Sequence, residues 1–136
     1  MKKIISLTLL VGIMVLAMSV PTFASNSVDV NINGEKLEVT DVKAEIVDGE
    51  LFVPLRAVFE KLGATVMWIE ENATIIVSAD DYKVIAQIGN NKVFLNNDNV
   101  IELEKAPYIV NNRTLISPVV FKEIYNIEIE ALTPQE

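Results

Sequence analysis

Residues 51–68 read LFVPLRAVFEKLGATVMW, and the spacing of the apolar residues changes within this stretch. The first three residues form a continuous apolar run, which is typical of a buried strand. Pro54 suits the first turn of a helix, and Gly63 can end that helix in the left-handed conformation. Between them, apolar residues recur at helical spacing, at Leu55, Val58, Phe59 and Leu62. The stretch predicts a strand, a helix of about two to three turns and a second strand at 65–69.

Turn residues divide the rest of the chain into short apolar segments. Asn33-Gly34 and Asp48-Gly49 favour two-residue hairpins, because both residues of each pair readily adopt a positive φ. Further strand-like segments occupy 74–78, 83–88 and 92–96. The pattern predicts an α+β fold in which short antiparallel strands and hairpins pack on two short helices.

The second half of the chain resembles the first. A shift of 63 residues places Val93 on Val30, and it places Asn97, Asn112 and Asn126 on three glycines. Asparagine is the non-glycine residue that best tolerates left-handed backbone, so the replacements favour the same turns in both halves. Ser117-Pro118 offers an N-cap and a first-turn proline for a second helix at 119–125. We interpret the pattern as an internal pseudo-repeat, about 28–69 and 91–131, within one domain.

The first 24 residues have the organisation of a secretory signal peptide. Lys2 and Lys3 precede an apolar run at 4–20, and Thr22 and Ala24 place small residues where a signal peptidase reads them. A retained membrane anchor is the alternative, since 17 residues is about the lower limit for crossing a bilayer. Cleavage between Ala24 and Ser25 leaves a single domain at 25–136 in a secreted or cell-envelope protein.

Composition excludes several kinds of chemistry. The chain has no cysteine and no histidine, so it lacks disulfides, a cysteine nucleophile and a Ser-His-Asp triad. After cleavage the only soft metal donor is the Met67 thioether, and we expect no specific copper site and no cofactor. The exported chain carries nine basic and 19 acidic side chains, a net charge of −10. Nucleic acid and anionic lipid are therefore poor partners, and membrane contact is expected only through an uncleaved signal peptide.

The central motif resembles a known family. Its residues are Pro54, Leu55, Arg56, Glu60, Leu62, Gly63 and Trp68. This series is similar to the copper amine oxidase N-terminal-like domain, also called the stalk domain, which is frequent in exported proteins of Gram-positive bacteria. The resemblance implies a non-catalytic module of antiparallel sheet packed on helix, set apart from copper and quinone chemistry, in which these residues are structural.

Individual side chains allow sharper expectations. Arg56 lies one helical turn before Glu60, which favours an ion pair, with ligand contact as the alternative. Trp68 shares a strand face with Val66, so we expect it to be buried and Trp68→Ala to cost about 3–5 kcal/mol. A sugar-stacking platform is the alternative for Trp68. Tyr82 and Tyr108 are then the surface candidates for ligand contact.

The remaining acidic and polar clusters fall in expected turns. These are Glu70-Glu71, Asp80-Asp81 and the asparagine-rich segment 96–99. Solvated carboxylates in turns lack the enclosed setting that acid–base catalysis needs, so we expect no enzyme and no metal site.

These observations favour a non-catalytic exported module that acts in spacing, docking or assembly at the cell envelope. Binding of cell-wall glycan or another polysaccharide is the alternative. The partner is thus an unidentified protein or a cell-wall polymer, and unpaired sheet edges give a route to a homo-oligomer.

We predict that the exported form begins at Ser25, because Thr22 and Ala24 are the well-spaced small pair after the apolar run. Intact-mass measurement of protein from the culture supernatant checks this. A cell-bound species that retains Met1 would show an anchor instead.

Overall fold

The computed structural model describes residues 26–132, so the signal peptide and its cleavage site lie outside the described residues. The strands are β1 (Asn26–Ile32), β2 (Glu35–Lys36), β3 (Ala44–Val47), β4 (Glu50–Pro54), β5 (Thr65–Ile69), β6 (Thr74–Ser78), β7 (Lys83–Gln87), β8 (Lys92–Leu95), β9 (Asn99–Glu102), β10 (Tyr108–Val110), β11 (Arg113–Ile116) and β12 (Ile129–Leu132). The helices are α1 (Leu55–Lys61) and α2 (Val119–Tyr125), with a short 3-10 turn, η1, at Glu70–Asn72.

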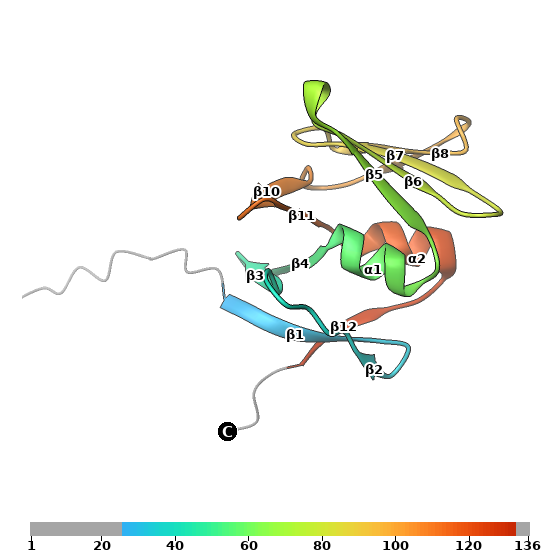
Figure 1. Cartoon of the computed structure of the whole chain (residues 1–136). Helices are drawn as coiled ribbons and strands as arrows, with labels where there is room; N and C mark the ends of the chain where they lie inside the picture. The colour runs from blue at the N-terminus through green and yellow to red at the C-terminus, as the bar shows by residue number, and fades with distance from the viewer. Residues whose placement is uncertain (1–25, 133–136) are drawn as a thin grey trace, which may run out of the picture.

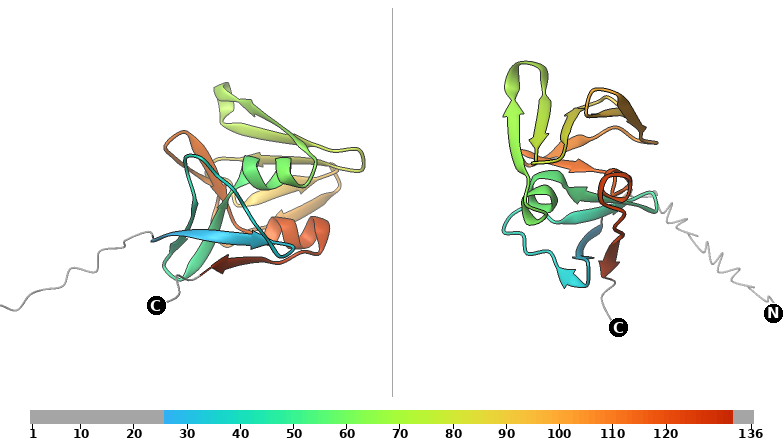
Figure 2. Two further views of the ribbon diagram at one scale, coloured as in Figure 1. Left: turned by 60° about the horizontal axis from the view of Figure 1, so that its bottom comes forward. Right: turned by 90° about the vertical axis from the view of Figure 1, so that its right-hand side faces the viewer.

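The strands form two antiparallel sheets, and both helices lie between them (Figure 1). The larger sheet has the order β10-β11-β4-β3-β1-β12, with β2 paired to β1. The smaller sheet has the order β5-β6-β7-β8-β9. The right-hand view of Figure 2 shows the helices end-on, side by side between the two layers. The α+β prediction is confirmed.

Left-handed residues make the hairpins, as the sequence predicts. Asn33 and Gly34 have φ of 51° and 81°, and Asp48 and Gly49 have φ of 51° and 80°. The three asparagines that align with glycines also have positive φ, namely Asn97 (67°), Asn112 (64°) and Asn126 (56°). Their short polar side chains tolerate this conformation, which a bulky or β-branched side chain does not.

The two helices match the predicted ranges and join the sheets through one core. Leu55, Val58 and Phe59 are the buried residues of α1, and Val120 and Phe121 are those of α2. The rings of Phe59 and Phe121 are fully buried, with centroids 4.6 Å apart. The hydroxyl of Ser117 accepts a hydrogen bond from the Val119 N–H at 3.3 Å, at the predicted start of α2.

One strand is shorter than the pattern indicates. The apolar residues after the first hairpin turn suggest a strand through Val39, but β2 ends at Lys36. Leu37 instead turns into the main core and is 5% exposed, while its N–H still donates to the Val30 carbonyl at 2.9 Å. Residues 38–43 form a loop that leads to β3. Val42 in this loop packs on a second core.

This second core lies on the other face of the larger sheet. Phe52 and Leu115 are buried there beneath Val42, while their strand neighbours Val53 and Ile116 face the helices. Tyr108 packs edge-on against Phe52 with ring centroids 5.1 Å apart. The larger sheet is therefore covered on both faces at its centre.

The 63-residue repeat stays a prediction. Each half contains one seven-residue helix that directly follows a hairpin of the larger sheet, β3-β4 before α1 and β10-β11 before α2. Within residues 26–132, none of the helices has the length and apolarity to span a bilayer.

We predict that Phe59→Ala costs about 3–5 kcal/mol of unfolding free energy, because it leaves a cavity between the helices. Urea denaturation followed by circular dichroism measures the change. Glu123→Ala, at an exposed position of α2, is the control and should change stability by less than about 0.5 kcal/mol. Equal effects of the two substitutions would contradict the packing described.

Candidate functional site

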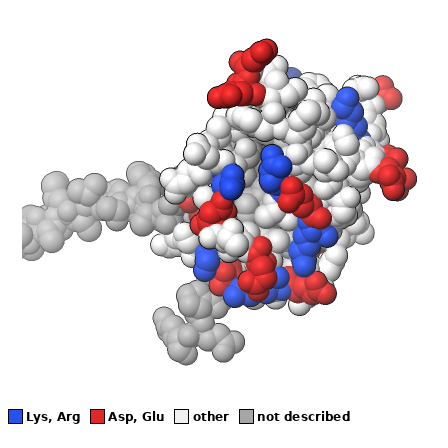
Figure 3. Space-filling view, viewed as in Figure 1, with Lys and Arg blue, Asp and Glu red and all other residues white. Residues whose placement is uncertain are grey.

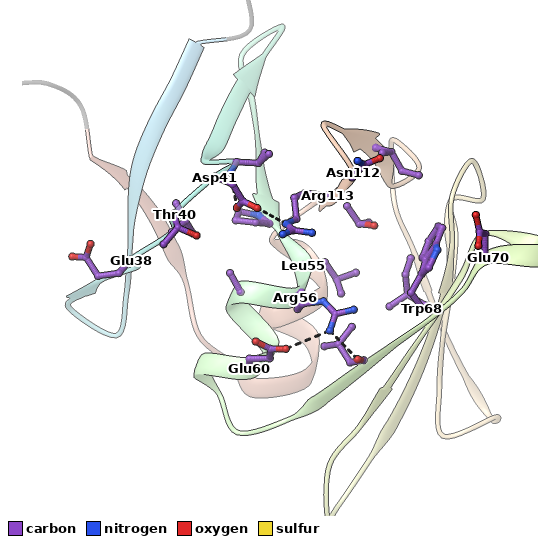
Figure 4. A pocket seen from close by; sticks show the side chains of 18 residues that line it. Glu38, Thr40, Asp41, Leu55, Arg56, Glu60, Trp68, Glu70, Asn112 and Arg113 are labelled. Carbon is purple, nitrogen blue, oxygen red and sulfur yellow. Dashed lines mark hydrogen bonds and ion pairs between the residues drawn. The ribbon is translucent and has the colours of Figure 1, made fainter.

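A groove of about 900 Å³ opens where the two sheets diverge around the start of α1 (Figure 4). Its walls come from the loop 38–42, the first turn of α1, strand β5 and the β10-β11 hairpin. Its volume is at the upper end of the range for small-molecule sites. The residues that the argument below uses are Glu38, Asp41, Arg56, Glu60, Trp68, Glu70 and Arg113.

Trp68 lies in this groove and is 38% exposed, so the prediction that it is a core residue is wrong. Strand alternation does place it on the inner face with Val66, which is 8% exposed. However, α1 begins only at Leu55, and Arg56 in its first turn donates to the Val66 carbonyl rather than reaching Trp68. Trp68 lies further along β5 and lines the groove with part of its ring exposed (Figure 4).

Arg56 forms the ion pair that its spacing predicts. Its Nη1 lies 3.5 Å from Oε1 of Glu60 and donates to the Val66 carbonyl at 3.2 Å. The Arg56 and Glu60 side chains are 48% and 53% exposed, so the pair adds little stability, at most about 1 kcal/mol. The guanidinium group thus ties α1 to β5 and also faces the groove.

Asp41 and Arg113 form a second ion pair that sequence reasoning missed. Arg113 Nε donates to Asp41 Oδ2 at 2.6 Å, which joins the loop 38–42 to β11. Asp41 Oδ1 accepts a hydrogen bond from the Val42 N–H at 2.8 Å. This backbone bond and the nearby Arg113 lower the pKa of Asp41. The two residues are 72 positions apart, so local spacing carries no signal for their contact.

The two tyrosines proposed as surface contacts lie outside the groove lining. Tyr82 packs edge-on against Tyr125, with ring centroids 5.4 Å apart, and its hydroxyl is buried. Burial raises the pKa of Tyr82. The Tyr108 hydroxyl donates to Oε1 of Glu45 at 2.5 Å, and burial together with this carboxylate raises the Tyr108 pKa. Both hydroxyls are directed into the protein, and ligand contact by these residues stays a prediction.

The other motif residues have structural positions. Pro54 and Leu55 are buried at the junction of β4 and α1. Leu62 is partly buried after α1, and Gly63 has φ of 91°, which confirms the expected left-handed helix end. The acidic pairs lie in turns as expected, with Glu70 and Glu71 in η1 and Asp80 and Asp81 between β6 and β7.

The groove combines an aromatic ring with charged side chains that are already paired. Within residues 26–132, no group of three or more acidic, histidine or cysteine side chains could hold a metal ion. The hydrogen bond from the Val42 N–H and the nearby Arg113 lower the pKa of Asp41, which keeps this carboxylate ionised rather than poised to donate a proton. An aromatic ring beside two ion pairs offers a flat apolar surface next to hydrogen-bond donors and acceptors.

Because Trp68 is partly exposed, we predict the results of two measurements. Acrylamide should quench its fluorescence efficiently, because part of the ring is exposed, and excitation at a wavelength that tyrosine does not absorb isolates the signal of the single tryptophan. Trp68→Ala should cost about 1–2 kcal/mol, less than Phe59→Ala, because the ring already contacts water. Urea denaturation compares the two variants. Strong protection from acrylamide would show instead that Trp68 is buried in the core.

The comparisons with known proteins agree with the motif. The family model described as Copper amine oxidase N-terminal domain matches residues 31–132, about three quarters of the chain. No curated protein matches the sequence. In the copper amine oxidases this domain is non-catalytic. The chain belongs to the copper amine oxidase N-terminal domain family.

Proposed function

We propose that this chain is an exported, non-catalytic module that docks on a component of the cell envelope through the groove around Trp68. Membership of a non-catalytic domain family supports the absence of enzyme activity. The n-region, apolar run and small residues of the first 24 positions support export.

The observation that carries the proposal is the exposed tryptophan in the groove. Tryptophan is among the residues that most often dominate binding energy, because its large ring contributes apolar contact and an N–H donor. A module that only spaces other parts of a protein has no need to leave such a ring uncovered in a groove. Docking therefore explains Trp68 better than spacing does.

The charges around Trp68 support binding over catalysis. Both arginines of the groove form ion pairs, at 2.6 Å and 3.5 Å. On the face shown in Figure 3, basic side chains lie beside acidic ones rather than in a separate basic patch. A surface of this kind orients a ligand through hydrogen bonds while the aromatic ring supplies contact area.

The proposal predicts that the purified protein sediments with isolated cell envelopes and that Trp68→Ala reduces the bound fraction by about tenfold or more. Phe94→Ala is a matched control, because Phe94 is also 38% exposed but faces the opposite side of the same sheet. Circular dichroism should show that both variants are folded.

Three outcomes would contradict docking through the groove. They are failure of the wild-type protein to sediment, equal binding by Trp68→Ala, and loss of binding by Phe94→Ala alone.

A further inference from the structure

We infer that the groove binds a neutral glycan chain, with Trp68 as the platform on which a sugar ring stacks. This inference rests on the proposed docking function and specifies the ligand. It depends on three features of the groove. These are its charge, the arrangement of its hydrogen-bond donors and acceptors, and the contact that Arg56 makes with the edge of strand β5.

The charge of the groove disfavours a polyanion. Its lining carries four carboxylates, Glu38, Asp41, Glu60 and Glu70, but two guanidinium groups, those of Arg56 and Arg113. Since each arginine already faces a carboxylate, its positive charge is largely compensated and attracts a phosphate or uronate group only weakly. The net charge of −10 of the exported chain would also repel an anionic wall polymer.

A strongly cationic ligand is no better matched. Asp41 and Glu60 are engaged by the arginines, which leaves Glu38 and Glu70 as the further negative charges. Figure 4 shows these two residues on opposite sides of the groove, Glu38 beside Thr40 and Glu70 beyond Trp68. Two separated and solvated carboxylates do not concentrate the field that would select a cation.

The ion pairs suit hydroxyl groups. In each pair, guanidinium N–H donors lie next to carboxylate acceptors, and the side chains of Arg56, Glu60, Asp41 and Arg113 are all 46–53% exposed. A sugar hydroxyl both donates and accepts, so neighbouring hydroxyls can bond to both members of a pair without breaking it. The indole ring of Trp68 supplies the flat apolar surface that the C–H face of a sugar ring requires.

An extended peptide is the competing ligand, because β5 is the edge strand of the smaller sheet. Peptides bind such edges by adding a strand through main-chain hydrogen bonds. Here Arg56 Nη1 already bonds to the carbonyl of Val66, the second residue of β5, at 3.2 Å. The Arg56 side chain thus lies along the edge where an added strand would have to pair, which favours the glycan.

The test uses soluble tetrasaccharides of different charge and follows Trp68 fluorescence, which reports the groove directly because the chain has one tryptophan. The neutral probes are β-1,4-linked tetramers of N-acetylglucosamine and of glucose. The charged probes are the deacetylated glucosamine tetramer and tetragalacturonate, and a peptide of alternating valine and lysine tests strand addition. Calorimetry gives the affinity of Trp68→Ala, which has no tryptophan to follow.

We expect at least one neutral tetramer to change the fluorescence saturably, with an affinity that varies less than about twofold between roughly 50 and 500 mM salt. Trp68→Ala should weaken binding by about tenfold or more, and Phe94→Ala should leave it unchanged. Preferential binding of a charged tetramer or of the peptide would overturn the inference. So would failure of both neutral tetramers while envelope binding still requires Trp68, a result that would leave the docking function intact.

Discussion

The contact between Phe59 and Phe121 supports the whole structure. Each ring belongs to a helix of seven residues, and helices this short are not stable in water by themselves. They persist because each one buries its apolar face between two sheets and against the other helix. The same contact holds the two sheets together, since residues of both sheets pack around these rings in one continuous core.

The groove opens at the start of α1. The first turn of this helix lines the groove together with Trp68 of β5. The motif places a proline at the end of β4, so that the helix begins only at Leu55. In this chain, one residue series thus contributes both to the core, through Leu55, and to the candidate site, through Arg56 and Trp68.

Two ion pairs define the groove on either side of this helix start. Arg56 pairs with Glu60 within α1 and connects the helix to β5 through its hydrogen bond to the Val66 carbonyl, and Arg113 connects β11 to the loop that precedes β3. Exposed ion pairs contribute little to the free energy of unfolding. The main effect of these contacts is therefore to fix the positions of the loop and the strand. Four of the side chains that shape the site are thus bound to one another.

The sequence by itself determined the local structure, because turns and helix limits depend on near neighbours. The hairpin dipeptides, the asparagines with positive φ and the ranges of α1 and α2 all follow from residues a few positions apart. The Arg56–Glu60 pair was predictable for the same reason. Only the tertiary structure decided that Trp68 is uncovered and that Asp41 meets Arg113. Alternation specifies the face on which a side chain lies, but the elements that pack on that face come from distant parts of the chain, and their length decides what remains exposed.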